Sequence, residues 1–370
     1  MKQVEGGTSN FEKSLNATTT TITTGTGNFN TVSGITNSNI VFGGDGIANL
    51  NNGLTGNVTT NSAGTGTLNL VGSNNQTVNG TVGVGNALKD VNSGVGTSTF
   101  NGTVNSQNVT NTGTGTTTFK ENVIATNVNV NAGTSNFEKS LNATTTTITT
   151  GTGNFNTLSG TTTSDIVFGG NGTANLNNGL TGNVTTNTLN TGTLNLVGTN
   201  NQTITGTVGS TNALKDVNSG VNGTTSTFNG IVNSQNVTNT GNGTTIFQDD
   251  VIATNVNVNT GTSTFQDNLT ATTTTITTGT GNFNTLSGTT SSNIVFGGDG
   301  IANLNNGLTG NVTTNSAGTG TLNLVGSNNQ TVNGNVGVGN ALKDVNSGVG
   351  TSTFNGTVNS QNVTNTGTGI

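Results

Sequence analysis

Two consecutive stretches decide the fold: "FKENVIATNVNVNAGTSN" at Phe119–Asn136 and "FEKSLNATTTTITTGTGN" at Phe137–Asn154. With Phe as position zero, both stretches place apolar residues at positions four, six and eleven, and Gly at position fourteen. Side chains of a strand alternate between two faces, so the change from even to odd positions predicts a corner after position six. Gly suits a second corner, because it adopts backbone angles that other residues avoid. Each unit of roughly 18 residues is therefore expected to form three short sides, and no helical spacing competes with this pattern.

A single coil of three short strands cannot bury its apolar side. Stacking coils about 4.8 Å apart pairs their backbones and closes a core. The sequence therefore predicts an all-β fold, a parallel β-solenoid (β-helix) built from coils of this repeated unit. We expect Phe100, Phe119, Phe137 and Phe155 to stack in one column, and asparagines to form hydrogen-bonded ladders.

A longer repeat contains these coils. Phe29 recurs as Phe155 and again as Phe283, which places the copies at about 1–126, 127–254 and 255–370. The first of these two steps equals seven of the short units, so each copy is expected to make seven coils. The chain begins and ends in the middle of a unit without a visible cap, so we expect residues 1–370 to be one repeat array and a fragment of a longer one.

The composition excludes several classes of function. The chain has seven Lys, no Arg and a net charge of -6, whereas nucleic-acid binding needs clustered cations, so no nucleic-acid partner is expected. Cys and His are absent, which excludes disulfides and Cys/His metal sites. No apolar run reaches the length of about 18 residues that crosses a bilayer, and the first residues lack the apolar core of a secretory signal. We therefore expect no transmembrane segment in this sequence.

Few residues are candidates for chemistry. Asp249 and Asp250 are adjacent carboxylates, and paired carboxylates can hydrolyse glycosidic bonds. Adjacent strand residues point to opposite faces, however, so a solvated corner is the favoured interpretation. One Lys-Asp pair recurs in each copy and is expected to form exposed ion pairs; these pairs are Lys89–Asp90, Lys215–Asp216 and Lys343–Asp344. The sequence thus predicts no catalytic, cofactor-binding or metal-binding residues and no cofactor, and it leaves the binding residues unknown.

A glycine-rich motif also recurs once in each copy. "FGGDG" at Phe42–Gly46 returns as "FGGNG" from Phe168 and as "FGGDG" from Phe296. Calcium-binding solenoids carry related motifs, but as short tandem repeats with Asp ligands in register. Here the second copy has Asn171 in place of the Asp, and the Lys-Ser/Thr of a phosphate-binding loop is missing. A tight glycine-rich turn is the predicted role.

Two phrases resemble a known family: "GTGTLNLVGSNNQTVNGTVGVGNAL" at Gly64–Leu88 and "GTSTFNGTVNSQNV" at Gly96–Val109. They look like the passenger repeats of rickettsial outer-membrane surface antigens, which belong to the autotransporter class. The resemblance implies a long β-helical passenger outside an outer membrane, with roles in adhesion to host cells and as an immune target. It carries no residue-level binding site over to this chain.

These observations predict a non-enzymatic cell-surface repeat protein that acts in adhesion or as a surface antigen. Host-cell surface proteins are the expected partners, and stacking of coil ends or self-association is a further expected contact. A remnant of a decayed surface-antigen gene is one alternative, because Ser38–Gly115 and Ser292–Gly369 differ at a single position. The other two alternatives are a polysaccharide-active β-helix enzyme and an ice- or other lattice-binding solenoid. The lattice-binding residues would be the outward threonines of two coils, namely Thr19, Thr21 and Thr23, and Thr145, Thr147 and Thr149.

Overall fold

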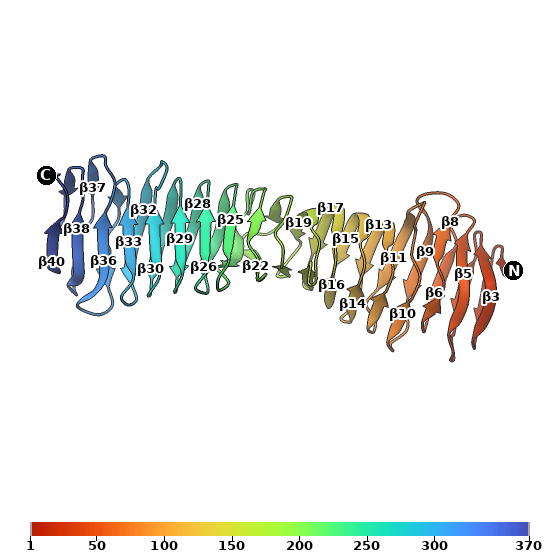
Figure 1. Ribbon diagram of the computed structural model, residues 1–370. Coiled ribbons are helices and arrows are strands. Elements are labelled where there is room, and N and C mark those ends of the chain that lie inside the picture. The colour runs from red at the N-terminus through yellow and green to blue at the C-terminus, as the bar shows by residue number, and fades with distance from the viewer. Residues whose placement is uncertain (1, 369–370) are drawn as a thin grey trace. The chain divides into compact units, whose positions relative to one another are not determined.

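The computed structural model describes residues 2–368, which form forty strands and no helix (Figure 1). The chain divides into two compact units, Met1–Thr181 and Gly182–Ile370, and each is described by itself. Strand pairing between neighbouring coils is parallel in both units. The structure confirms the predicted all-β parallel β-solenoid.

The first unit contains β1 (Lys2–Val4), β2 (Thr8–Phe11), β3 (Leu15–Ile22), β4 (Thr26–Phe29), β5 (Thr36–Phe42), β6 (Ile47–Leu50), β7 (Leu54–Thr55), β8 (Val58–Thr60), β9 (Thr65–Leu70), β10 (Gln76–Val78), β11 (Leu88–Ser93), β12 (Ser98–Phe100), β13 (Val104–Asn111), β14 (Thr116–Phe119), β15 (Val123–Val130), β16 (Thr134–Phe137), β17 (Leu141–Ile148), β18 (Thr152–Phe155), β19 (Thr162–Phe168) and β20 (Thr173–Leu176). The second unit contains β21 (Val184–Thr186), β22 (Thr191–Leu196), β23 (Gln202–Ile204), β24 (Leu214–Ser219), β25 (Thr225–Phe228), β26 (Val232–Asn239), β27 (Thr244–Phe247), β28 (Val251–Val258), β29 (Thr262–Phe265), β30 (Leu269–Ile276), β31 (Thr280–Phe283), β32 (Thr290–Phe296), β33 (Ile301–Leu304), β34 (Leu308–Thr309), β35 (Val312–Thr314), β36 (Thr319–Leu324), β37 (Gln330–Val332), β38 (Leu342–Ser347), β39 (Ser352–Phe354) and β40 (Ser360–Asn365).

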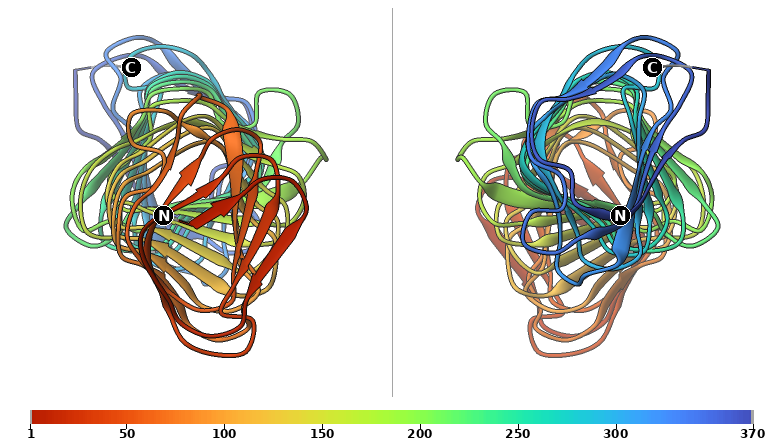
Figure 2. Two further views of the ribbon diagram at one scale, coloured as in Figure 1. Left: turned by 90° about the vertical axis from the view of Figure 1, so that its right-hand side faces the viewer. Right: turned by 90° about the vertical axis from the view of Figure 1, so that its left-hand side faces the viewer.

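The regular coils follow the predicted alternation and turn at the predicted place. In β17, Leu141 and Ala143 are buried, two outward threonines follow, and Thr146 and Ile148 are buried again. This change of parity bends the strand into two sides of the coil, and β18 supplies the third side. The second corner of the preceding coil, between β15 and β16, contains Gly133, whose φ of 65° lies in the left-handed region that favours glycine. Figure 2 shows the coils winding around a common interior when each unit is viewed from its end.

Stacked phenylalanines fill the core of both units. Phe100, Phe119, Phe137 and Phe155 form one column in the first unit, with ring centroids 5.1–5.3 Å apart. A second column joins β25, β27, β29 and β31 of the second unit through their last residues, with centroids 5.1–5.4 Å apart. Stacked aromatic pairs add about 0.5–1.5 kcal/mol each beyond the burial of their area. The predicted phenylalanine column is therefore confirmed.

The number of coils in one long repeat differs from the prediction of seven. Phe29 lies in β4, and the parallel strands that pair in turn with it on the same side of the solenoid are β6, β9, β11, β13, β15 and β17. Each pairing advances the chain by one coil, so β17 is six coils beyond β4. Phe155, the equivalent of Phe29 in the next copy, lies one side further on, in β18. One copy thus makes six and a third turns, because several coils are longer than the predicted unit. Asn49 bonds to Asn28 across 21 residues, and Asn92 bonds to Asn69 across 23 residues.

The second unit shows the same shift. Phe228 lies in the column of β23, β25 and β27, whereas its equivalent Phe354 pairs with Val332 of β37. The column of Val332 continues through Leu308 and Thr290 to Leu269, which is the first residue of a long strand. Equivalent residues of successive copies therefore face different sides of the solenoid.

Asparagine ladders run along the outside of the coils, as predicted. In the first unit, Asn28, Asn49, Asn69 and Asn92 each donate a side-chain hydrogen bond of 2.7–2.8 Å to the asparagine one coil earlier. A ladder in the second unit joins Asn282, Asn303, Asn323 and Asn346 at 2.8 Å. Because each amide both donates and accepts, the ladders satisfy polar groups between coils without any charge.

A buried asparagine holds the corner where the regular rhythm of the coils breaks. Asn156 follows Phe155 with a φ of 55°, and only 2% of its surface is exposed. Its amide Nδ2 donates to the carbonyl oxygen of Lys139 at 2.8 Å, and its Oδ1 accepts from the hydroxyl of Thr162. Asn30 and Asn284 have the same left-handed angle and the same kinds of hydrogen bonds in the other two copies. Asparagine tolerates this conformation better than other residues with side chains.

Candidate functional site

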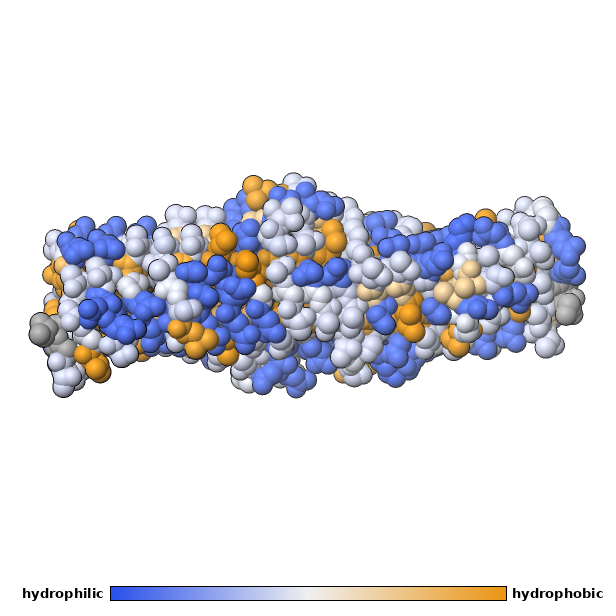
Figure 3. All heavy atoms as spheres, turned by 90° about the horizontal axis from the view of Figure 1, so that it is seen from above, coloured by the Kyte–Doolittle hydropathy of each residue, from blue (hydrophilic) through white to orange (hydrophobic). Residues whose placement is uncertain are grey.

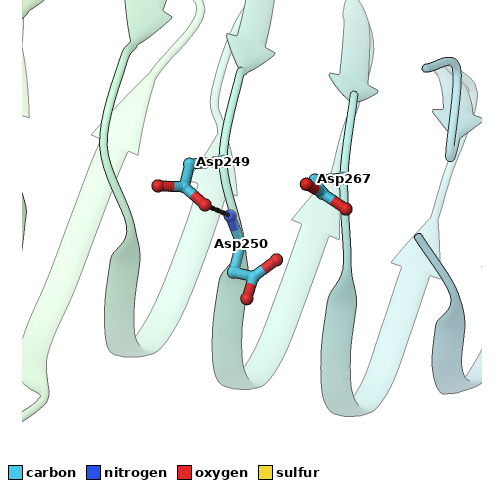
Figure 4. A group of neighbouring side chains, drawn as sticks. All are labelled: Asp249, Asp250 and Asp267. Atoms are coloured by element: carbon cyan, nitrogen blue, oxygen red, sulfur yellow. Dashed lines mark hydrogen bonds between the residues drawn. The ribbon is translucent and has the colours of Figure 1, made fainter. Parts of the chain in front are cut away.

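Three carboxylates gather at neighbouring corners of the second unit. Asp249 and Asp250 connect β27 to β28, and Asp267 occupies the corresponding corner one coil later, between β29 and β30 (Figure 4). Oxygen atoms of the three side chains lie within 4.8 Å of one another, and all three residues are partly exposed. The sequence singled out the first two residues, whereas Asp267 joins them only because a coil of the regular length places it alongside.

Hydrogen bonds already hold part of this carboxylate group. The backbone nitrogen of Asp250 donates to Oδ1 of Asp249 at 2.8 Å. Oδ1 of Asp250 accepts from the side chain of Asn268 at 2.8 Å, and Oδ1 of Asp267 accepts from the hydroxyl of Ser287 at 3.2 Å. A Ca²⁺ ion takes six to eight oxygen ligands, and three monodentate carboxylates would supply half of the smaller number. The group is chemically able to attract a hard cation, but its geometry does not assign one.

The preceding copy has an ion pair at the same corners. Glu121 and Lys139 occupy the positions of Asp249 and Asp267, and the Lys139 ammonium lies 2.7 Å from a Glu121 carboxylate oxygen. Both side chains are about two-fifths exposed. The two side chains at this pair of corners therefore attract each other in the first unit, as Glu121 and Lys139, and repel each other in the second, as Asp249 and Asp267.

The recurring lysines find partners that the sequence interpretation missed. Lys89 pairs with Asp45 at 3.0 Å rather than with the adjacent Asp90, and Lys343 pairs with Asp299 at 3.2 Å. The hydrogen bond and the negative charge of Asp45 raise the pKa of Lys89. The prediction that Lys89 and Lys343 pair with their neighbours in sequence is wrong, because these side chains reach across coils to the glycine-rich turn.

The second copy supports this explanation. Its residue equivalent to Asp45 is Asn171, and its lysine, Lys215, lies 3.7 Å from the adjacent Asp216 instead. The co-occurrence of Lys and Asp 44 residues apart in two copies was the signal that could have revealed the pairing. Asp90 itself accepts hydrogen bonds from Thr67 and Asn108 within the outer ladders.

The motif at Phe42–Gly46 forms a tight corner packed on the preceding coil. A Cβ atom at Gly44 would lie 2.8 Å from the carbonyl oxygen of Thr23, and one at Gly46 would lie 2.5 Å from a methyl carbon of Ile22. Close approach of two backbones is a common reason for glycine in such a turn. The glycines thus have a packing role, and Asp45 has the ion pair described above.

The two threonine rows that suggested lattice binding are each one coil deep. Thr19 and Thr21 face outward, and Thr20 is buried and hydrogen-bonded to Ser38, as the alternation requires. The next coil places Asn39 and Val41 beside the two outward threonines. The row at Thr145 and Thr147 is flanked by Asn127 and Asn129 on one side and by Asp165 and Val167 on the other. Neither row extends into the flat array that a lattice would contact.

Comparisons with protein-family models, with curated proteins and with solved structures found no match for this chain. Over residues 2–368, no helix is long and apolar enough to cross a membrane. Functional proposals therefore depend on the fold, the side-chain geometry and the sequence phrases described above.

Proposed function

We propose that this chain is a non-enzymatic repeat module displayed at a cell surface, where it acts in adhesion or as an antigen. This proposal rests on the composition of the outer face of the coils. Rows of uncharged Asn and Thr repeat from coil to coil over a core that is sealed by stacked Phe and aliphatic side chains. Figure 3 shows one such face, on which hydrophobic side chains appear in scattered spots among polar ones.

The phrases that resemble autotransporter passengers support the proposal. Gly64–Leu88 spans β9 and β10 and reaches the start of β11, and Gly96–Val109 spans β12 and most of β13. These phrases therefore form coils of the solenoid, as the repeats of a β-helical passenger would. The proposed location is outside an outer membrane, and the proposed partners are proteins of a host-cell surface.

Labelling of intact cells tests the proposed location. An antibody raised against the folded 370-residue chain should label intact cells of the source organism, and protease added to those cells should remove the signal. Labelling that appears only after permeabilisation would contradict surface display. Absence of the protein from the cells would favour the alternative of a decayed gene.

Binding to host cells tests the proposed role. Beads coated with the folded chain should adhere to host cells more than beads coated with a solenoid of unrelated sequence. Pre-incubation of the cells with soluble chain should reduce that adhesion. Equal adhesion of both kinds of bead would contradict a role in adhesion and leave the antigen role to be tested by the sera of infected hosts.

A further inference from the structure

Three successive corners of the first unit enclose a polar cavity of about 380 Å³. The corners connect β4 to β5, β6 to β7 and β9 to β10, and β4, β6 and β9 pair in that order. Six polar side chains line the cavity: Thr31, Ser33, Asn51, Asn52, Ser73 and Asn74. None of the described residues that line it is charged. Its volume lies within the range of about 300–1,000 Å³ that is typical of small-molecule sites.

Buried side chains hold the walls of this cavity in place. The amide of Asn30 donates to the carbonyl oxygen of Lys13 at 2.9 Å, and the amide of Gln76 donates to the carbonyl oxygen of Gly72 at 2.7 Å. A Cβ atom at Gly72 would lie 2.0 Å from the carbonyl oxygen of Asn51, so glycine allows the third corner to pack closely on the second. The corners are thus fixed before a ligand arrives, which lowers the entropic cost of binding.

The polar groups inside the cavity, by contrast, are free to bind a ligand. Over residues 2–368, no hydrogen bond engages five of the lining side chains, namely Thr31, Ser33, Asn52, Ser73 and Asn74. Hydroxyl and amide groups both donate and accept hydrogen bonds. A ligand that matches them therefore has to carry several groups that do the same.

The corresponding corners of the second unit use two of these groups internally. The equivalents of Ser33 and Asn52 are Ser287 and Asn306. The hydroxyl of Ser287 donates to Asp267 at 3.2 Å, and the amide of Asn306 donates to the carbonyl oxygen of Gly288 at 2.9 Å. The first unit makes neither bond within the described part of the chain, so its cavity is the open version of this arrangement.

We propose that the cavity of the first unit binds a neutral sugar. The hydroxyls of a sugar ring donate and accept hydrogen bonds, as the side chains that line the cavity do. An anionic ligand would require a cationic side chain or a helix N-terminus, and the cavity lining contains neither. A peptide that adds a strand requires a free sheet edge, whereas corners of paired strands do not supply one. Val32 also lines the cavity and is 69% exposed, so it can cover the apolar C–H face of a sugar.

This inference supplies a ligand class for the proposed adhesive role. It rests on that role only for the source of the sugar, which would be the glycans of host-cell surface proteins. Purified oligosaccharides therefore test the cavity independently of cells.

An array of neutral oligosaccharides with their sialylated and sulfated counterparts, probed with the fluorescently labelled full chain, tests the proposal. The chain should bind neutral members of the array, and calorimetric titration with the strongest neutral binder should give its affinity. S73K should weaken that affinity by roughly tenfold or more, because the longer side chain fills the cavity. N52A should weaken it by about two- to tenfold, the effect of losing one neutral hydrogen bond.

The matched control is S327K, the same substitution at the equivalent serine of the second unit, which is also exposed. It should bind the sugar as the wild type does, and circular dichroism establishes that each variant is folded. Failure of the wild type to bind any neutral member, or binding of charged members alone, would overturn the proposal. So would S73K binding as tightly as the wild type, or S327K losing as much affinity as S73K, since binding would then not depend on the groups that only the first unit leaves free.

The bead assay separates this inference from the proposed function. A chain that adheres to host cells but binds no neutral sugar would contradict the sugar site alone. A chain that binds the sugar, loses it in S73K and does not adhere to host cells would support the site and contradict the adhesive role.

Discussion

Replacing Asn156 separates two contributions that the structure combines at one corner. N156G keeps the left-handed backbone but removes the hydrogen bonds to the Lys139 carbonyl and the Thr162 hydroxyl. The Lys139 carbonyl and the Thr162 hydroxyl would then lack these hydrogen-bond partners, at a corner where only 2% of the Thr162 surface is exposed. Each unsatisfied buried polar group costs about 1–3 kcal/mol, so we expect the loss of two partners to lower the free energy of unfolding of this region by about 2–6 kcal/mol.

N156A should destabilise the region further. Alanine also loses both hydrogen bonds, and holding a non-glycine residue at left-handed angles costs about 1–2 kcal/mol. Glycine loses about 0.5–1 kcal/mol more backbone entropy than alanine on folding, which offsets part of that difference. N156A is therefore expected to be about 0.5–1 kcal/mol less stable than N156G.

Asn190 provides the control, since it has a φ of 58° but an exposed side chain. The chain itself places glycine at the equivalent positions of the other copies, Gly64 and Gly318. N190G should therefore change stability by less than about 0.5 kcal/mol, as is usual for surface substitutions.

Denaturant unfolding combined with hydrogen exchange measures the effect locally, which matters because repeat arrays open in parts. The peptide that spans β18 and β19 should lose protection in N156G and keep it in N190G. Equal behaviour of the two glycine variants would refute the assignment of stability to the side-chain hydrogen bonds of Asn156.

Three further changes test the core and the corners. F137A should lower the free energy of unfolding by about 3–5 kcal/mol, whereas F137L should lose only the two stacked contacts, about 1–3 kcal/mol; denaturant midpoints distinguish them. D267K should replace the repulsion by Asp249 with an exposed ion pair and stabilise the second unit by about 0.5–1 kcal/mol, with a gain that disappears at high salt; an equal gain at high salt would contradict an electrostatic cause. D45N should lower the pKa of Lys89 toward its ordinary value, measured by NMR of the side-chain methylene next to the ammonium. Because the pKa is raised in the folded chain, the Asp45 contact stabilises the fold at neutral pH, and its contribution is lost only as the pH rises through that raised value.

The local pattern of the sequence was sufficient to predict the coil. The alternation around Leu141 and Ile148, the corner between them and the phenylalanine column all depend on neighbours within one coil, or on coils of constant length. Where the coil length changes, the sequence no longer predicts the number of coils. From Phe29 to Leu50 the coil takes a longer course, and the ladder between β3 and β5 shifts register between Asn16 and Thr19. Extra residues at corners leave the apolar positions of the strands unchanged, so no hydrophobic signal records them.

The same irregularity explains what was missed at the candidate site. The pairing of Lys89 with Asp45 depends on how many coils separate two corners, and that number is fixed only by strand register. The carboxylates of Asp249 and Asp267, by contrast, are one regular coil apart, so their approach followed from the predicted period. Contacts along regular coils are readable from the sequence, whereas contacts across irregular ones are not.

The extra third of a turn in each copy restricts the partners that the repeated sequences can contact. In the first unit, Thr19 and Thr21 lie in the column of β5 and β8, whereas their equivalents Thr145 and Thr147 lie in the column that contains β4 and β6. Equivalent threonine pairs therefore lie on two different sides of the same unit. A flat lattice can touch only one of these sides, so duplication of the sequence does not enlarge a lattice-binding face. Separate small partners, such as protein domains on an opposing cell or antibody molecules, could contact both sides independently. The geometry of the duplication thus argues against recognition of an extended lattice and is compatible with the proposed adhesive or antigenic role.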